Sequence, residues 1–241
     1  MNTTKAAFYA RSGTFWSDMV TILHPPYTAW NMSYVALGAA LAPDLQWFRL
    51  VLALSAFFAG TGILSHALDE LNGRPLRTGL TDRELKIVSA LGMGAALVPV
   101  GIGAIVISPW ILAFATIGIL LVFAYSLEWF NGLVHNDLGF ALSWGGFPVI
   151  VGYWSQTETL SWPMWCVAGA ATLLSLAQRN LSTPARFVRR KAFSGLASFQ
   201  TKSGEVHWDS TRLLSTWERP LKLLSWTVVL LTVGFLVTRI S

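Results

Sequence analysis

Long apolar stretches, almost free of charge, constrain this chain more than any other feature. A helix needs about 20 consecutive apolar residues to cross a bilayer, and stretches of roughly this length recur along the sequence. The chain has 241 residues, of which 54% are hydrophobic and only 12% charged, against roughly 25% charged in soluble globular proteins. A bilayer accepts that much apolar surface when helices satisfy the backbone polar groups. We therefore predict an all-α integral membrane protein that forms a single membrane domain over residues 1–241.

Local signals set the limits of about seven transmembrane helices. Pro25 after His24 breaks the helix before the first span, because the residue before a proline is disfavoured in the helical region. Thr81 followed by Glu84 is a capping box that starts the third span, and Pro109 separates the third span from the fourth. The expected spans lie near residues 27–44, 47–68, 85–107, 109–127, 138–155, 160–178 and 221–238.

Two further segments complete the expected architecture. Residues 6–23 place Phe8, Phe15 and Met19 on one helical side, which predicts an interfacial helix lying on the membrane. Residues 179–220 are rich in arginine and lysine and predict a long basic cytoplasmic loop.

Basic residues gather beside alternate ends of the spans. Lysine and arginine occur in the N-terminus and in segments 69–86 and 179–220, whereas the connections near 43–46, 107–109 and 155–160 contain none. The positive-inside rule then places the N-terminus in the cytoplasm and the C-terminus outside. We expect a multi-pass protein of a plasma membrane or an organellar inner membrane, with its polar chemistry on the cytoplasmic side. Anionic lipids, and not nucleic acid, are the expected partners of the net charge of +5.

The segment 65–86 carries the strongest functional signal. His66, Asp69 and Glu70 are spaced to project from one side of the second span at its inner end, where ionisable groups are costly and usually functional. One interpretation is a site in which these three residues bind Mg²⁺ while Arg74 and Arg77 grip a diphosphate. The alternative is that His66 pairs with Glu70 and that the arginines bind lipid headgroups.

A family resemblance accompanies this segment. Gly73-Arg74-Pro75-Leu76-Arg77-Thr78 resembles the turn in the first signature motif of the UbiA superfamily of intramembrane prenyltransferases. Counted back from that turn, His66 and Glu70 occupy the places of two of the family's aspartates, and Asp69 adds a neighbouring carboxylate. Residues 24–27 and 125–154 are also similar to family segments, so that the resemblance covers roughly residues 24–155.

The resemblance implies a UbiA-like bundle that transfers an isoprenyl group from its diphosphate to an aromatic or lipid acceptor. It also implies Mg²⁺ as the cofactor and Asp69 and Glu70 as catalytic residues. The chain departs from the family, which usually has nine spans and a second Asp-rich motif on the sixth. The corresponding segment, residues 178–186, contains no carboxylate. Arg179, which lies there, is expected to hold the diphosphate with Arg74 and Arg77.

The connection between the fourth and fifth spans adds pocket candidates. Tyr125, His135 and Asp137 lie in or beside it, and His135 or Asp137 is a candidate base for activating the acceptor. His135 is also a candidate ligand of a metal or a tetrapyrrole. The alternative is that Asn136 or Asp137 simply caps the fifth span.

Two function classes therefore stay open. The first is the prenyltransferase, with an isoprenoid diphosphate and an apolar acceptor as its partners. The second is a catalytically degenerate UbiA-like scaffold that binds a lipid, a quinone or a pigment, or serves a membrane complex as an accessory subunit with membrane-protein partners. A transporter has less support, because the sequence shows no inverted repeat.

Overall fold

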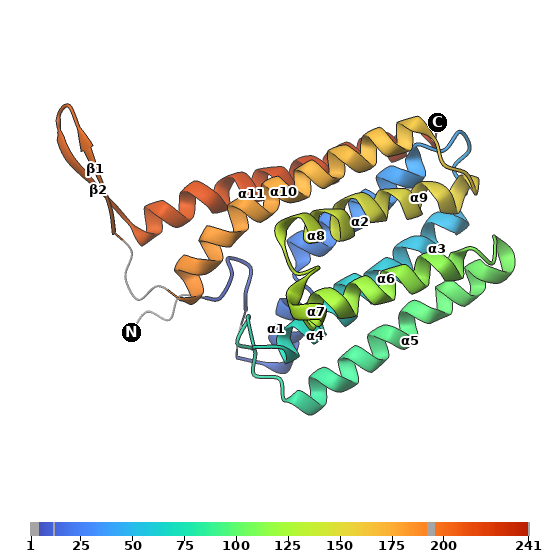
Figure 1. The fold of residues 1–241 in the computed structure, drawn as a ribbon, viewed down its shortest axis with the longest axis horizontal. Helices are drawn as coiled ribbons and strands as arrows, with labels where there is room; N and C mark the ends of the chain where they lie inside the picture. Colours follow the sequence, from blue (N-terminus) through green and yellow to red (C-terminus); the bar gives the residue numbers. More distant parts are fainter. Residues whose placement is uncertain (1–4, 12, 192–195, 241) are drawn as a thin grey trace.

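The computed structural model describes residues 5–11, 13–191 and 196–240, and within them the chain is mostly helical. Long helices run roughly along one axis, and the chain ends lie at opposite ends of that axis (Figure 1). One of them, Trp47–Leu71, is continuous and consists of α3 (Trp47–Phe57), the π-helical turn η1 (Phe58–Ser65) and α4 (His66–Leu71). The others are α2 (Pro25–Ala40), α5 (Asp82–Val106), α6 (Ile111–Ser126), α8 (Asp137–Ala141) continued by η2 (Leu142–Gly146) and α9 (Phe147–Thr157), α10 (Trp162–Arg190) and α11 (Ser210–Val237).

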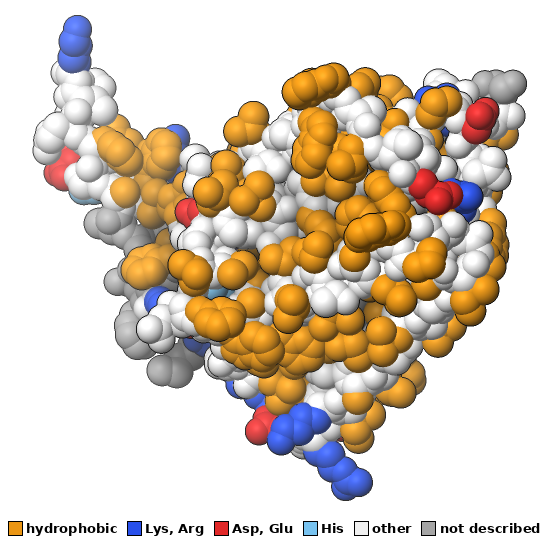
Figure 2. Space-filling model, turned by 45° about the vertical axis from the view of Figure 1, so that its right-hand side comes forward, with side chains coloured by type: hydrophobic (Ala, Val, Ile, Leu, Met, Phe, Trp, Pro, Cys, Tyr) orange, Lys and Arg blue, Asp and Glu red, His pale blue; other side chains and the backbone are white. Residues whose placement is uncertain are grey.

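Three helices in the described residues are long and apolar enough to cross a membrane, namely Trp47–Leu71, Asp82–Val106 and Ser210–Val237. A fourth apolar helix, α6, is shorter. Only 28% of the apolar window of α5 and 22% of that of α11 is buried in the protein. Large side chains such as Leu91, Ile105 and Leu230 are exposed instead, and hydrophobic groups cover much of the face seen in Figure 2. Such a surface suits a bilayer and not water.

The predicted helix limits are confirmed where local chemistry sets them. Thr81 Oγ1 accepts the backbone N–H of Glu84 (3.3 Å), and the Glu84 carboxylate accepts the N–H of Thr81 (2.7 Å). The first helix, α1 (Phe15–Ile22), ends before His24, and α2 begins at Pro25. The connection at Pro109 separates α5 from α6.

The N-terminal segment differs from the predicted interfacial helix over 6–23. Helix occupies only Phe15–Ile22, because Gly13 adopts a φ of 109° and Thr14 begins α1 with its own capping box. The residues before it turn back onto the protein, where Ala7 and Ala10 are buried against Leu76. The predicted helix over 6–23 is therefore shortened to its second half, and the residues before it pack on the turn after α4.

The predicted loop over 179–220 is also largely replaced by regular structure. α10 continues to Arg190 and α11 begins at Ser210, with an antiparallel hairpin of β1 (Leu196–Thr201) and β2 (Gly204–Asp209) between them. The hairpin projects from one end of the bundle (Figure 1). Hydropathy falls where the charges begin, but the helices continue beyond the apolar stretch. The guanidinium of Arg189 binds the carboxylate of Glu218 through two hydrogen bonds and thereby joins α10 to α11.

Small residues allow the helices of the core to approach closely. A Cβ atom on Gly38 of α2 would collide with the carbonyl of Val149 on α9, and one on Gly152 with that of Val35. Gly145 of η2 meets α10 in the same way, with the Ala171 carbonyl oxygen 2.6 Å from where its Cβ would lie. Such contacts are typical of helix packing in membranes, and they fix η2 and α10 around the site described next.

Candidate functional site

A polar cavity of about 440 Å³ lies where the N-terminal segment, the Trp47–Leu71 helix, the 126–137 connection and α10 meet. We refer to it below as the polar cavity. The titratable residues that line it are Tyr9, His24, Tyr27, His66, Asp69, Tyr125, Glu128, His135, Arg179, Arg186, Arg190 and Lys191.

Helix α10 supplies the positive charge of the polar cavity. Arg179, Arg186 and Arg190 are separated by seven and four residues, a spacing that keeps them on one helical side. Arg179 binds the carboxylate of Asp137 (2.8 Å), whereas the Arg186 guanidinium donates to the neutral hydroxyl of Thr183 (3.1 Å). Burial, together with the neighbouring Arg179 and Arg190, lowers the pKa of Arg186. An anion in the cavity would relieve this repulsion.

Of the predicted trio on the second span, two members face the polar cavity. His66 and Asp69 line it. The Nδ1–H of His66 donates to the carbonyl of Gly62 in the π-helical turn (3.1 Å), which fixes the imidazole ring. Asp69 lies beside the hydroxyl of Ser126 and within electrostatic range of Arg179 and other cationic groups.

Glu70, the third member, is turned away from the polar cavity and is fully buried. Its carboxylate accepts the backbone N–H groups of Leu76 and Thr78 (both 2.8 Å) and the hydroxyl of Thr78 (2.9 Å). These three bonds hold the turn after α4 in shape. The structure therefore gives Glu70 a structural role in the turn.

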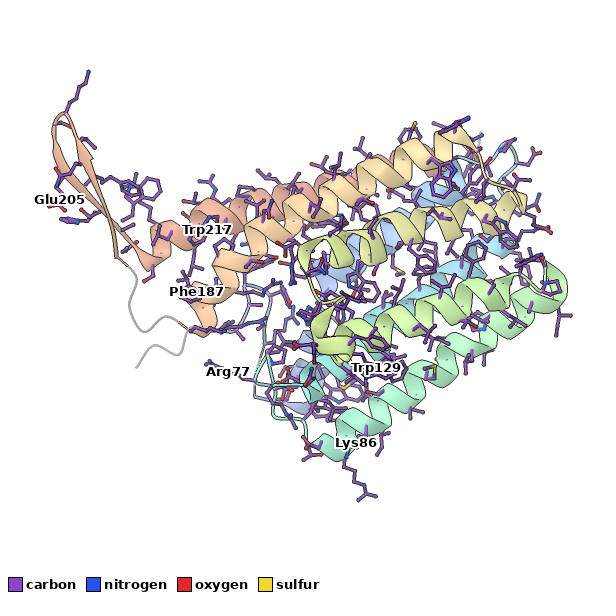
Figure 3. The ribbon with its side chains drawn as sticks, viewed as in Figure 1. Arg77, Lys86, Trp129, Phe187, Glu205 and Trp217 are labelled. Carbon is purple, nitrogen blue, oxygen red and sulfur yellow. The ribbon has the colours of Figure 1, made fainter. Side chains whose placement is uncertain are left out.

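The side chains of Arg74 and Arg77, in the same turn, likewise bind groups outside the polar cavity. Arg74 binds the carbonyl of Leu80 and the carboxylate of Asp82. Arg77 donates to the carbonyl of Arg190 (2.7 Å) at the end of the bundle (Figure 3). The residues lining the polar cavity include Pro75 but neither of these arginines. Of the three arginines predicted to hold a diphosphate, the structure brings Arg179 to the cavity.

The side chains present do not form a protein cage for Mg²⁺. In the described residues, no group of three or more His, Cys, Asp or Glu side chains is arranged to hold a metal ion. Glu70 is occupied by the turn, which leaves Asp69 as the carboxylate of the predicted trio that faces the cavity. Mg²⁺ usually binds one or two carboxylates together with substrate phosphates, so Asp69 suits an ion that arrives with a diphosphate.

The connection between α6 and α8 contains predicted site residues that line the polar cavity and one residue that caps a helix. Tyr125 and His135 line the polar cavity, with their rings stacked at a centroid distance of 4.4 Å. The Nδ1–H of His135 donates to the Tyr125 carbonyl (2.9 Å). Asp137 binds Arg179, and the side chain of Asn136 accepts the N–H of Gly139 (2.8 Å). The predicted helix cap is thus confirmed at Asn136.

Sequence reasoning missed a second group of cavity residues around His24. The Tyr9 hydroxyl hydrogen-bonds to Nδ1 of His24 (2.9 Å), and the His24 ring stacks on that of His66 with centroids 4.0 Å apart. Burial and the positive charges of its neighbours lower the pKa of His24 well below 6.5, and burial raises the pKa of Tyr9 well above 10. The left-handed backbone of His24 (φ 45°) places its ring against these partners.

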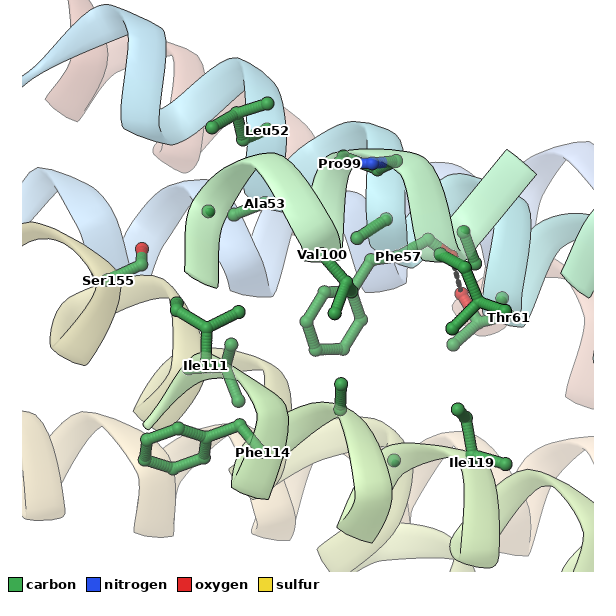
Figure 4. A pocket seen from close by; sticks show the side chains of 18 of the residues that line it. Leu52, Ala53, Phe57, Thr61, Pro99, Val100, Ile111, Phe114, Ile119 and Ser155 are labelled. Carbon is green, nitrogen blue, oxygen red and sulfur yellow. Dashed lines mark hydrogen bonds between the residues drawn. The ribbon is translucent and has the colours of Figure 1, made fainter. Parts of the chain in front are cut away.

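A smaller apolar cavity of about 110 Å³ adjoins the polar one. It is lined by hydrophobic side chains of α3, α5 and α6, including Phe57, Val100 and Ile119 (Figure 4). Thr61 of η1 and Trp144 of η2 line both cavities. Two π-helical turns, which are frequent at functional sites, therefore contribute lining residues to both cavities.

No protein-family model, no curated protein and no solved structure matches this chain.

Proposed function

We propose that this chain is a UbiA-like membrane prenyltransferase, which moves an isoprenyl group from its diphosphate to an aromatic or lipid acceptor. The observation that carries the proposal is that an arginine-rich polar cavity and an apolar cavity share Thr61 and Trp144 as lining residues. An isoprenoid diphosphate has the same division into an anionic head and a hydrocarbon tail. In this proposal all seven predicted spans cross the membrane, and the polar cavity faces the cytoplasm.

The diphosphate head is assigned to α10. Arg179, Arg186 and Arg190 line the polar cavity, and guanidinium groups bind phosphate oxygens in pairs of hydrogen bonds. Arg74 and Arg77 take no part in this revised site, because their guanidinium groups bind Asp82 and a backbone carbonyl instead. The tail enters the apolar cavity between α3 and α6.

The proposed reaction begins when the bond between the allylic carbon and the diphosphate oxygen breaks, with the electron pair leaving on the diphosphate. Guanidinium groups aimed at the developing charge lower the barrier. A nucleophilic atom of the acceptor bonds to the allylic carbon and loses a proton, which the released diphosphate takes up. Tyr125 and Trp144, packed edge to face with centroids 5.8 Å apart, shield the cation from water.

Mg²⁺ remains part of this proposal: it would arrive with the diphosphate and neutralise part of its charge, and Asp69 would be the protein residue that holds it. Glu70 is omitted as a ligand and as a catalytic residue because its carboxylate holds the turn. His135 is retained as a wall of the acceptor site.

Purified protein in nanodiscs tests the function directly. Isoprenyl diphosphates of several chain lengths are offered with aromatic or lipid acceptors, with and without Mg²⁺, and the prenylated product is measured. We expect turnover that is lost in Arg186→Gln and kept in Arg83→Gln, a matched change at an exposed arginine outside the cavity. Absence of product from every donor would contradict the enzymatic proposal.

A second candidate function is favoured by one observation. In the described residues the carboxylates that line the polar cavity are Asp69 and Glu128, which is few for diphosphate chemistry assisted by metal ions. A scaffold that binds a lipid, quinone or pigment, or that serves a membrane complex, needs no such cluster. Mass spectrometry and absorption spectra of the protein purified from its membrane test this candidate, which predicts a bound lipid, chromophore or partner chain.

A further inference from the structure

The ring of His24 presents a buried polar atom without a partner. Its Nε2 is buried and has no hydrogen-bond partner among the described residues, although His24 lines the polar cavity. Buried polar atoms in proteins are nearly always hydrogen-bonded, so an exception calls for an explanation. A ligand of the cavity is the simplest one.

The contact with Tyr9 indicates what Nε2 offers to that ligand. The Tyr9 hydroxyl lies 2.9 Å from Nδ1 of His24, and an imidazole nitrogen accepts a hydrogen bond more readily than a phenol oxygen does. When the hydroxyl donates to Nδ1, a neutral imidazole carries its hydrogen on Nε2. Nε2–H is then a hydrogen-bond donor that lacks an acceptor.

The groups around this donor are also donors. Arg186 and Arg190 are the charged residues that act on the His24 ring. Arg190 donates from Nε to the carbonyl of Ala6 (3.2 Å), and Arg186 donates from Nη2 to the hydroxyl of Thr183. Each guanidinium therefore retains further N–H groups. Asp69 lines the same cavity. The side chain stacked on the His24 ring is the imidazole of His66, which is not a carboxylate acceptor.

We propose that Nε2–H of His24, together with Arg186 and Arg190, forms a subsite for a phosphate-type anion, with Tyr9 as the residue that positions the imidazole. The subsite rests on the proposed function only for the identity of its natural ligand, the head of an isoprenoid diphosphate. A phospholipid headgroup presents the same oxygens. In either case the N-terminal segment contributes to ligand binding, since Tyr9 and the Ala6 carbonyl come from it.

Calorimetric titration of inorganic diphosphate into the purified protein tests the subsite. His24→Asn is the informative variant, because Asn tolerates the left-handed backbone and keeps a polar group near Tyr9 but does not extend to the position of Nε2. His24→Gln is the matched control, because its longer amide places an N–H near that position. We expect His24→Asn to weaken diphosphate binding about tenfold to a hundredfold, as for the loss of a hydrogen bond to a charged group. We expect His24→Gln to stay within about threefold of the wild type.

The possible outcomes distinguish failure of the subsite from failure of the proposed enzymatic function. Equal affinity in the wild type and His24→Asn, or no diphosphate binding by a folded wild type, overturns the subsite. Binding that depends on His24 in a protein without prenyl-transfer turnover supports the subsite and contradicts the proposed enzyme. Repeating the titration in nanodiscs with and without phosphatidylglycerol separates the two sources: competition by this lipid assigns the subsite to a headgroup, and no competition assigns it to the diphosphate.

Discussion

The turn after α4 and the C-terminal end of α10 both carry clustered charges, but their side chains face different surroundings. In the turn the charges satisfy one another or the backbone: Glu70 accepts three hydrogen bonds from residues 76 and 78, and Arg74 binds Asp82. At α10, Arg186 and Arg190 face a cavity. A sequence motif can therefore contain the residue types of a ligand site although the contacts of those residues stabilise the fold instead.

The first test concerns the turn. Glu70→Ala leaves the buried N–H groups of Leu76 and Thr78 without acceptors, and we expect it to lower the free energy of unfolding by about 4 kcal/mol. Denaturant titration in detergent measures the loss. Glu205→Ala, at an exposed position of β2, serves as the control and should change little. A stable Glu70→Ala protein that has lost only Mg²⁺ dependence would show instead that Glu70 belongs to a metal site.

The second test compares the arginines of the two regions. We expect Arg186→Gln combined with Arg190→Gln to weaken binding of an isoprenyl diphosphate by about 2–3 kcal/mol, roughly 30-fold to 150-fold, because two charge-assisted contacts are lost. Arg77→Gln should remain within about threefold of the wild type. Binding is measured by displacement of a fluorescent diphosphate analogue. A larger loss of binding in Arg77→Gln than in the double variant would place the anion at the turn.

The third test uses pH. Burial and the positive neighbours hold the pKa of His24 below 6.5 in the folded protein, so the unfolded chain binds more protons as the pH falls. The contribution of this ring to stability is therefore complete above about pH 6.5. It is lost below that pH by at most about 1.4 kcal/mol per pH unit for one proton. The titratable groups that surround the ring are Tyr9, Tyr27, His66, Arg186 and Arg190.

Unfolding measured between pH 7.5 and 5.5 should accordingly show a steeper decline in the wild type than in His24→Asn. Parallel curves for the two proteins would show that the pKa of His24 is the same in the folded and unfolded chains, and a smaller decline in the wild type would show that the ring is charged in the folded state.

The fourth test is the smallest. The ion pair of Arg74 and Asp82 lies near the surface, with the Asp82 side chain 70% exposed. We expect Asp82→Asn to cost less than about 1 kcal/mol of stability and to leave diphosphate binding unchanged. A loss of binding in this variant would mean that the turn communicates with the polar cavity.

The helices were predictable from sequence where the deciding chemistry is local. The capping box of Thr81 and Glu84, the proline after His24 and the break at Pro109 each act within a few residues, and the structure confirms them. The end of α10 and the hairpin were not predicted, because hydropathy marks where an apolar stretch stops and not where a helix stops.

The candidate site was only half predictable for a related reason. His66, Asp69 and Arg179 were expected in it and line the polar cavity. Tyr9 and His24 reach the cavity through the fold of the N-terminal segment, which no local pattern specifies. One signal for the missed arginines was present in the sequence, since positions 179, 186 and 190 share one side of a helix.

Photolabelling tests the central claim, that one isoprenoid diphosphate occupies both cavities, most directly. An isoprenyl diphosphate carrying a photoreactive group on its tail is irradiated with the protein in nanodiscs, and the labelled residues are mapped by mass spectrometry. The account predicts labels on Phe57 or Ile119 in the apolar cavity that disappear with excess inorganic diphosphate. Labels confined to exposed apolar residues such as Leu91 and Ile105, unaffected by diphosphate, would contradict it.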